Sequence, residues 1–514
     1  MQDTTFTSTT LYSALADIAL LTPSAPAIVY EGQTIQYSEL IERIDVVADY
    51  LNSLGLRGGH AIAAFGQNSP DFAIHYYAAA KLGVVFVPLN FNLTPAEIAY
   101  ILNHCEAKFL FLDDDATALM INSSETAMFR SQFRPLRMPV RSEWGVNLIA
   151  PSVPEADHDL IIAYTSGTTG TPKAVVMDHN AQLGAAKALK EFWGLNSKDC
   201  TVVAAPLGFL LGLSTATTVG LLNGMKVVLH RRFHPAEVLD SMVEHKVTVY
   251  TGVPTMYSMM LEYSEQQDIT YDLSKVRSLI CCGAPLADEL KKRFETRFCQ
   301  RLQNYYGMTE CYPLIGKFAN DPNPLPEGCV GRIAPNASIR IVASDGKECE
   351  PDVAGEMLVK AASMLKRYHK DPALTEASLV DGWFKSGDLG SIDAAGYIYI
   401  TGRIKDIIIR GGANISPVEI ENALHRHPEV QDAAVIGVSD ERYGEVPVAF
   451  ITRRQGCEAL ESNLLQHCKV ALAKFKVPAS IIVCDALPLG STGKVDKQAL
   501  KKQWTKLNTA VTPS

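Results

Sequence analysis

Regularly spaced cysteine pairs, an excess of basic residues and an uninterrupted apolar run are all missing from this chain of 514 residues. Its eleven cysteines show no Cys-x-x-Cys spacing, which argues against a disulfide framework and favours a reducing compartment such as the cytoplasm. The net charge of −9 argues against nonspecific binding to nucleic acid, because such binding needs a basic face. The first ten residues contain no basic cluster, so a secretory signal is not predicted.

A membrane span is not predicted either, although residues 201–225 carry no charged side chain. Pro206 and four glycines interrupt this stretch, and six Ser, Thr and Asn residues make it more polar. These interruptions favour a buried strand and helix within an α/β core over a membrane-spanning helix.

The length of the chain exceeds the usual limit of one hydrophobic core, so two or more domains are expected. Residues 11–150 alternate short apolar runs with helical patterns, as parallel α/β units do. Buried strands are predicted at 61–65, 84–88 and 109–112, and Thr94 to Glu97 has the sequence of a capping box at a helix start.

The C-terminal part, from residue 404 onward, has an α+β pattern. A second capping box is predicted at Ser416 to Glu419. The acidic triplet Asp113–Asp115 is predicted to be a solvated loop rather than a metal site. The chain contains no internal repeat and no low-complexity segment.

A loop rich in small hydroxyl residues and glycines separates two apolar runs and leads into Pro172 and Lys173. Glycines allow positive φ, so successive backbone N–H groups can form a concave nest for anionic oxygens, and the hydroxyls and a lysine suit a polyphosphate. The loop is not a Walker motif, because its glycines are too close together and a strand-like run follows it. By composition alone, a flexible hairpin loop remains the alternative. The loop residues are Thr165, Ser166, Gly167, Thr168, Thr169 and Gly170.

The run from Tyr164 to Val175 resembles the phosphate-binding loop of the adenylate-forming superfamily, in which glycine is usual where Ala174 stands. This superfamily contains acyl-CoA synthetases, adenylation domains of peptide synthetases and luciferases. Further matching blocks occur in the family's order across nearly the whole chain. They include Asn304 to Glu310, Gly382 to Asp388 and Gly402 to Asp406. The chain is identified as a member of this superfamily and is most similar to an acyl-CoA synthetase.

The resemblance implies the fold and its division into two domains. Residues 1–403 would form a large α/β domain that binds ATP and the acyl group, built of stacked mixed sheets with flanking helices and a small β subdomain. Residues 404–514 would form a small, mobile α+β domain that carries the catalytic lysine. The hinge would lie near Lys405, although a solvated charged linker has the same composition.

The resemblance also assigns the nucleotide contacts. The adenine would lie between the Tyr306 ring and a second wall, and Asn304 would contact its exocyclic amine. Asp388 would accept the ribose hydroxyls, with Arg403 as a second ribose or phosphate contact. Taken alone, each of these residues would fit a turn or a linker. The second wall of the adenine site would be Gly283, Ala284 and Pro285.

The implied catalytic residues surround the phosphates. Thr309 would contact a phosphate, Glu310 would bind magnesium, and Lys173 would follow the loop. Lys494 would reach into the site during adenylation, although a lone lysine on a loop is usually solvated. In a second step, the segment of Gly411 and Gly412 would help to form a tunnel for the pantetheine arm of coenzyme A.

The acyl pocket would lie around residues 206–212 and 307–308. No aspartate occurs in the first segment, and an unpaired ammonium in an apolar pocket is costly, so an α-amino acid substrate is disfavoured. The apolar side chains favour a medium-chain or aromatic acid. The predicted pocket residues are Phe209, Leu210, Gly212, Gly307 and Met308, and Leu211, Tyr312 and Pro313 add to the apolar character.

The expected reaction joins a small carboxylic acid to ATP, releases pyrophosphate and transfers the acyl group from the adenylate to the thiol of coenzyme A, with Mg²⁺ as cofactor. Two alternatives stay open. The chain could load a carrier protein instead, or it could be a relative that binds nucleotide without catalysis. A homodimer is left open, and no nucleic acid partner is expected.

Overall fold

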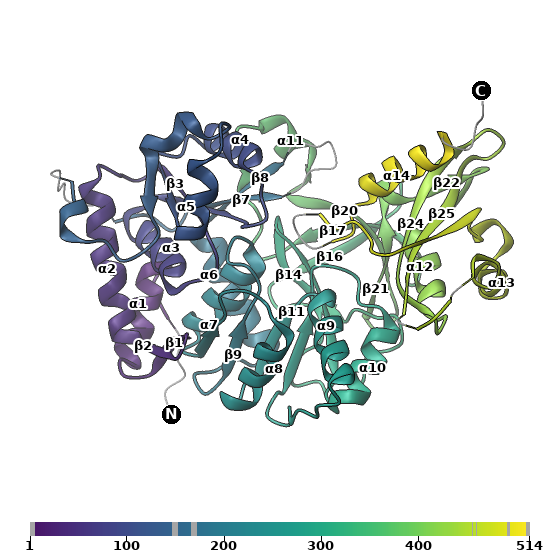
Figure 1. Cartoon of the computed structure of the whole chain (residues 1–514), viewed down its shortest axis with the longest axis horizontal. Coiled ribbons are helices and arrows are strands. Elements are labelled where there is room, and N and C mark those ends of the chain that lie inside the picture. The colour runs from purple at the N-terminus through teal and green to yellow at the C-terminus, as the bar shows by residue number, and fades with distance from the viewer. Residues whose placement is uncertain are drawn as a thin grey trace.

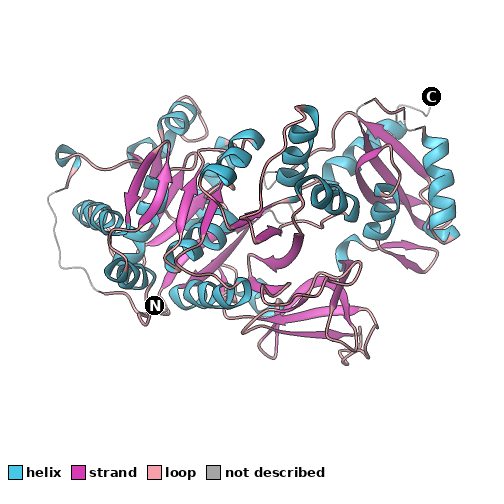
Figure 2. Cartoon of the chain, turned by 90° about the horizontal axis from the view of Figure 1, so that it is seen from below, coloured by secondary structure: helices cyan, strands magenta, loops and turns pink. Residues whose placement is uncertain are grey.

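The computed structural model describes residues 6–145, 153–165, 172–454, 456–458, 460–490 and 494–509. The chain folds into a large N-terminal domain and a small domain at its C-terminal end, at opposite ends of the long axis (Figure 1). Strands lie between helices in both parts (Figure 2). The predicted fold class, α/β followed by α+β, is therefore confirmed.

The largest sheet of the described chain has nine strands in the order β15-β14-β13-β12-β11-β9-β10-β1-β2. The six strands from β13 to β1 pair in parallel, and the outer strands are antiparallel. The strands are β1 Pro26–Tyr30, β2 Gln33–Gln36, β9 Cys200–Val203, β10 Lys226–Leu229, β11 Val249–Gly252, β12 Ser278–Cys281, β13 Leu302–Met308, β14 Cys311–Gly316 and β15 Arg332–Ile333.

A second sheet has seven strands in the order β18-β8-β7-β4-β3-β5-β6. Its central strands match the predicted buried strands to within one residue. The strands are β3 Ala61–Phe65, β4 Val85–Leu89, β5 Phe109–Leu112, β6 Phe133–Pro135, β7 Asp159–Thr165, β8 Lys173–Asp178 and β18 Arg367–Tyr368.

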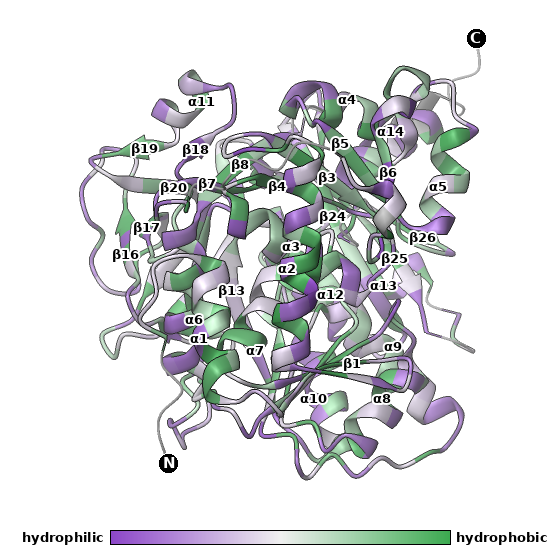
Figure 3. Ribbon diagram, turned by 90° about the vertical axis from the view of Figure 1, so that its left-hand side faces the viewer, coloured by the Kyte–Doolittle hydropathy of each residue, from purple (hydrophilic) through white to green (hydrophobic). Residues whose placement is uncertain are grey.

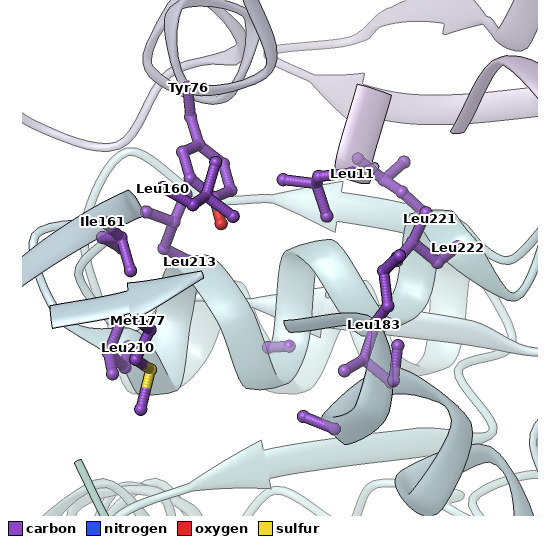
Figure 4. Close-up of a cluster of buried hydrophobic side chains, with 14 of the residues drawn as sticks. Leu11, Tyr76, Leu160, Ile161, Met177, Leu183, Leu210, Leu213, Leu221 and Leu222 are labelled. Carbon is purple, nitrogen blue, oxygen red and sulfur yellow. The ribbon is translucent and has the colours of Figure 1, made fainter. Parts of the chain in front are cut away.

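The two sheets are stacked on each other, as the alternating burial of side chains along their strands shows. In β3, Ile62 and Ala64 face the core between the sheets, whereas Ala63 and Phe65 face the outer helices. The central core is filled by side chains from five helices, and part of it is drawn in Figure 4. These helices are α1 Leu11–Leu21, α2 Tyr37–Ser53, α3 Pro70–Leu82, α6 His179–Trp193 and α7 Val219–Leu222.

Helices also cover the outer faces of the stack. Residues of α4 Pro95–Cys105 and α5 Asp114–Ile121 pack on the seven-stranded sheet. Residues of α8 Pro235–Glu244, α9 Pro254–Gln266 and α10 Asp288–Phe298 pack on the nine-stranded sheet. The polar and apolar residues of these helices can be followed in Figure 3. None of the helices in the described ranges is both long and apolar enough to cross a membrane.

A small antiparallel sheet joins this stack to the C-terminal domain, and short helix α11 Pro372–Ala377 precedes its strand β19. Its strands are β16 Ser338–Val342, β17 Gly355–Lys360, β19 Leu379–Val380, β20 Trp383–Ile392 and β21 Ile398–Arg403. This sheet corresponds to the β subdomain that the resemblance implied. A one-turn 3₁₀ helix, Ile404–Asp406, follows it directly.

The C-terminal domain has one sheet with helices on both faces. Helices α12 Pro417–His425 and α13 Glu461–Ala471 pack on one face, and Leu500 of α14 Lys497–Thr509 packs on the other. The strands are β22 Ile408–Arg410, β23 Ala413–Ile415, β24 Val430–Asp440, β25 Gly444–Arg453 and β26 Ser480–Cys484.

Two local predictions were wrong. The acidic triplet is not a solvated loop, because Asp113 caps α5 by accepting a hydrogen bond from the backbone N–H of Ala116 at 2.8 Å. Ser416 precedes α12 but makes no capping bond. Its hydroxyl donates instead to the carbonyl of Thr401, across the junction between the domains. The capping box at Thr94 is confirmed, with both reciprocal bonds present.

Residues 206–212, which belong to the predicted acyl pocket, pack closely against the end of β4 in the seven-stranded sheet. Gly208 precedes η3, a π-helical stretch at Leu211–Thr218. A Cβ on Gly208 would lie 2.4 Å from the carbonyl oxygen of Leu89 and 2.5 Å from Cα of Asn90. Both are backbone atoms, so the missing side chain is what allows this close approach.

We expect Gly208→Ala to lower thermal stability, because overpacking against a rigid backbone typically costs about 1–3 kcal/mol. Differential scanning calorimetry would measure the effect. The matched control is Gly58→Ala, since a Cβ there would lie 3.7 Å from the nearest atom, the carbonyl oxygen of Gly83. Equal melting temperatures for both variants would contradict this packing.

Candidate active site

The predicted phosphate loop connects two paired strands. Thr165 ends β7, Lys173 begins β8, and these two residues are direct partners in the antiparallel pair. The predicted strand after the loop is thus confirmed. The remaining loop residues lie outside the described part of the chain; they are Ser166, Gly167, Thr168, Thr169 and Gly170.

Tyr368 of β18 connects Lys173 to Glu310. The Lys173 ammonium lies 5.4 Å from the centroid of the Tyr368 ring. The Tyr368 hydroxyl donates a hydrogen bond to Oε1 of Glu310 at 3.1 Å. Burial and the neighbouring Glu310 carboxylate raise the pKa of Tyr368, so its hydroxyl keeps its proton. The backbone of Glu310 is held as well, because its carbonyl accepts a bond from the N–H of Leu365 at 2.6 Å. Thr309 and Glu310 form the turn between β13 and β14.

A buried carboxylate links the residues predicted to hold adenine and ribose. Asp388 is directly opposite Arg403 in the pair of β20 and β21, and Arg403 Nε lies 2.7 Å from Asp388 Oδ1. The Tyr306 hydroxyl donates to Oδ2 of the same carboxylate. The Asp388 side chain is only 3% exposed, and each of its oxygens has a partner. The loss of either partner would be costly, because it would leave a buried charged group incompletely paired.

The other predicted adenine contacts lie at the neighbouring strand end. Asn304 of β13 is in register with Cys281 of β12, and residues 283–285 follow this strand end. Gly283 has a φ of +84°, which a residue with a side chain rarely adopts. Asn304 Oδ1 accepts a bond from the N–H of Tyr305 at 3.0 Å. The topology therefore brings together the segments that were predicted to hold the base.

Lys494 comes from the C-terminal domain but lies in this cluster. Burial lowers the pKa of its amine, and the Arg403 guanidinium lowers it further. The side chains of Asp388, Cys282 and Glu310 act in the opposite direction, so they also lie near the amine. The expected meeting of Lys494 with the large domain is therefore present in the structure.

Two side-chain contacts accompany this arrangement of the domains. Gln431 Nε2 donates to Glu262 Oε1 of α9 at 2.9 Å, and the Arg454 guanidinium lies 3.9 Å from Glu289 of α10. Lys405, the predicted hinge residue, is in the 3₁₀ turn between the domains. Burial lowers its pKa, and positive neighbours that include Lys173 lower it further.

The predicted acyl-pocket segments meet through Tyr312. A Cβ on Gly307 would lie 3.0 Å from the Tyr312 Cβ. The Tyr312 hydroxyl accepts a bond from Gln182 at 3.0 Å, and Ser214 of η3 acts on its pKa, which burial raises to about 12. Met308 packs on the same core. Of the other predicted residues, Phe209 and Leu210 directly precede η3, and Gly212 is its second residue.

Gly411 and Gly412 are placed apart from this cluster, in the turn between β22 and β23. Their φ values are +57° and +85°, so the turn itself favours glycine at both positions. The Gly411 N–H donates to the carbonyl of Tyr443 at 2.7 Å, within the small domain. Neither Tyr368 nor Cys282 was predicted from the sequence to neighbour Glu310 or Lys494, because only the tertiary fold brings them there.

A buried Asp388 carboxylate that engages Tyr306 and Arg403, with Lys494 brought beside it from the C-terminal domain, is the arrangement expected of an adenylate-forming enzyme. The family model described as AMP-binding enzyme matches residues 15–369, and the model described as AMP-binding enzyme C-terminal domain matches residues 419–494. The chain belongs to the AMP-binding enzyme family.

Known relatives span nearly the whole chain. A feruloyl-CoA synthase from an Amycolatopsis species is 34% identical, over 95% of this chain and 97% of that protein. The o-succinylbenzoate CoA synthetase of Bacillus subtilis, solved with ATP and a magnesium ion, has a TM-score of 0.83 at 30% identity, over 95% and 99% of the two chains. ATP-bound MatB from Rhodopseudomonas palustris reaches 0.88 at 29% identity, over 97% and 99%, whereas apo MatB reaches 0.77.

We expect Asp388→Asn to weaken ATP binding about tenfold to a hundredfold, because a hydrogen bond to a charged group contributes about 1.5–3 kcal/mol. Titration calorimetry with Mg-ATP would measure the affinity. Asp393→Asn is the matched control, since the Asp393 carboxylate accepts bonds from the backbone N–H groups of Ala395 and Tyr397 in its own turn and from the Tyr399 hydroxyl. Unchanged affinity in Asp388→Asn would remove this carboxylate from the nucleotide site.

Proposed function

We propose that this chain joins an apolar aromatic acid to coenzyme A and that Lys494 serves the first of its two half-reactions. The enzyme is an acid–thiol ligase: it forms an acyl-adenylate from ATP with release of pyrophosphate and transfers the acyl group to the thiol of coenzyme A. The observation that carries the assignment of Lys494 is the proximity of its amine to Asp388 and Glu310 of the large domain, whose carboxylates act to raise its pKa.

The first step needs no protein nucleophile, because an oxygen of the acid's carboxylate attacks the α-phosphate and pyrophosphate leaves. The side chains of the protein position the two reactants and supply positive charge beside the reacting oxygens. Asp388 and Arg403 would hold the ribose, and Lys173 would lie against the phosphates. The Lys494 ammonium would stabilise the negative charge that develops on the reacting oxygens. Such a preorganised donor is typically worth about 10²–10³ in rate.

Magnesium fits the surroundings of Glu310. Among the described residues, no group of three or more His, Cys, Asp or Glu side chains could form a complete metal cage. Magnesium does not need one, since it is usually held by one or two carboxylates together with phosphate oxygens and water. When bound, it neutralises polyphosphate charge and helps the leaving group depart. The bond from Tyr368 would hold the Glu310 carboxylate in the required orientation.

The proposed acid is supported by the apolar character of the pocket segments and by two relatives named for aromatic acids, ferulate and o-succinylbenzoate. The medium-chain alternative from the sequence is kept as the second choice. The absence of an acidic side chain from residues 206–212 continues to disfavour α-amino acids.

The domain boundary is proposed at residues 403 and 404, with the hinge at Lys405. Support comes from the end of β21 at Arg403 and the start of the next sheet at Ile408. A carrier protein as acceptor, a homodimer and a cytoplasmic location stay predictions from the sequence. All eleven cysteines are free thiols, which fits a reducing compartment.

We expect Lys494→Ala to slow adenylate formation about 10²–10³-fold while leaving the conversion of supplied acyl-adenylate to thioester nearly intact. Gly412→Leu should have the reverse effect, because a side chain in a narrow thiol tunnel would block the second step. Single-turnover kinetics of each half-reaction would measure both effects.

Lys497→Ala provides a control, since Lys497 pairs with Glu421 inside the small domain at 2.9 Å. Because Gly412 has positive φ, Gly412→Asn serves as a second variant that tolerates this backbone. Equal damage to both half-reactions in the Lys494 and Gly412 variants would contradict the division of labour.

We expect Glu310→Gln to raise the magnesium concentration needed for half-maximal pyrophosphate release, because a neutral amide binds the cation more weakly. Tyr368→Phe should raise it less, since the carboxylate would remain but lose its hydrogen bond. A magnesium titration would measure both, with Glu376→Gln on α11 as the control. An unchanged titration curve for Glu310→Gln would exclude Glu310 from the metal site.

A further inference from the structure

We propose that Asn68 is a positioning residue for the carboxylic acid. Its side-chain amide holds the backbone at Ala205 and Leu207, and this backbone in turn fixes the segment that would line the acyl pocket. The inference rests on the proposed function, since it concerns how the chain holds residues 206–212. Asn68 precedes Ala205 by 137 positions, so this contact is made only by the tertiary fold.

Every polar group of the Asn68 side chain is used. Its Oδ1 accepts a hydrogen bond from the backbone N–H of Leu207 at 2.7 Å. Its Nδ2 donates to the carbonyl of Ala205 at 3.1 Å and to the carbonyl of His230 at 3.0 Å. Asn68 is only 3% exposed. Loss of the amide would therefore leave buried backbone groups without these partners, which is costly.

These bonds take over where strand pairing stops. The pairing of β9 with β10 ends at Val203, so Ala205 and Leu207 lie beyond the ladder. Between them stands Pro206, which has no N–H to donate. The amide of Asn68 presents a carbonyl and N–H groups, as a peptide unit does. It therefore continues the pairing of this segment past the end of the strand.

Asn68 is itself on a firmly held turn, between β3 and α3. Its own N–H donates to the carbonyl of Arg231 at 3.2 Å. The N–H of Gln67 donates to Oδ2 of Asp113 at 2.8 Å, and Ser69 is the N-cap of α3. The turn after a strand of the seven-stranded sheet thus anchors a segment that follows a strand of the nine-stranded sheet.

The anchored backbone is connected directly to η3. The carbonyl of Pro206 accepts a bond from the N–H of Phe209 at 3.1 Å, and the carbonyl of Phe209 accepts one from Leu213 at 3.0 Å. A Cβ on Gly212 would lie 2.4 Å from the carbonyl oxygen of Pro206. A displacement of Pro206 must therefore move Phe209 and the first turn of η3. Asn68 would act on the acid through these residues.

The predicted nucleotide contacts are held by other elements. Asp388 and Arg403 are paired between β20 and β21, and Tyr306 of β13 donates to the same carboxylate. Removing the Asn68 amide should therefore disturb the binding of the acid and spare the binding of ATP.

The test measures pyrophosphate release with benzoic, cinnamic, ferulic and hexanoic acid in the presence of coenzyme A, varying acid and Mg-ATP separately. We expect Asn68→Ala to lower kcat/KM for the best acid about 10–100-fold, mainly by raising its KM, since a misplacement of about 1 Å can cost about 10²-fold. The KM for Mg-ATP should stay unchanged, and the ratios of kcat/KM among the acids should change. An enzyme that is merely less stable has fewer active molecules, which lowers kcat for every acid alike and changes neither KM.

Two further variants sharpen the comparison. Asn68→Ser keeps one hydroxyl that can replace part of the bonding, so its acid KM should rise less, and it serves as the test if Asn68→Ala does not fold. Asn223→Ala is the matched control. Asn223 is 1% exposed, and its Nδ2 donates to the carbonyl of Val219 in its own helix at 2.7 Å. This control should lower the melting temperature and leave the acid KM unchanged.

The outcomes separate the two proposals. An unchanged acid KM in the Asn68 variants, an equal rise of the acid and ATP KM values, or the same acid shift in Asn223→Ala would overturn the role of Asn68. Each of these results would leave the ligase assignment intact. Failure of every acid to release pyrophosphate with the wild-type enzyme would overturn the proposed function, and the role of Asn68 with it.

Discussion

The buried carboxylate of Asp388 is the interaction on which the arrangement of the site depends. It accepts bonds from Arg403 and Tyr306, and it favours the charged form of Lys494 and of Lys405. Without this negative charge, the cationic side chains of Arg403, Lys405 and Lys494 would repel one another with less compensation. The carboxylate therefore offsets the electrostatic repulsion that Lys494 of the C-terminal domain would otherwise meet beside Arg403.

The two stacked sheets determine where this carboxylate can act. Parallel strands β11, β12 and β13 lie side by side, and Tyr306 of β13 reaches Asp388 of β20 in the β subdomain. Lys173 belongs to β8 of the other sheet and is connected through Tyr368 to Glu310, in the turn that precedes β14. The site is thus assembled from both sheets, the β subdomain and one loop of the C-terminal domain.

The sequence predicted features that depend on neighbours in the chain. The strand Phe109–Leu112 and the cap at Thr94 followed from local periodicity and spacing, and both have the predicted bounds. Ser416 had the same local pattern, but a long-range bond to Thr401 replaced the cap. Tyr368 could not be found, because its role follows from the pairing of β18 with β8, nearly two hundred residues earlier in the sequence.

The lowered pKa of Lys494 has a consequence for the linkage between protons and nucleotide. Burial and Arg403 disfavour the ammonium form in the absence of a ligand. A polyanion beside the amine would favour that form and raise the pKa again. Binding must then take up protons at any pH between the two pKa values, and the affinity must fall as the pH rises through this window. The binding of nucleotide, the uptake of a proton and the approach of the C-terminal domain are therefore thermodynamically coupled at this site.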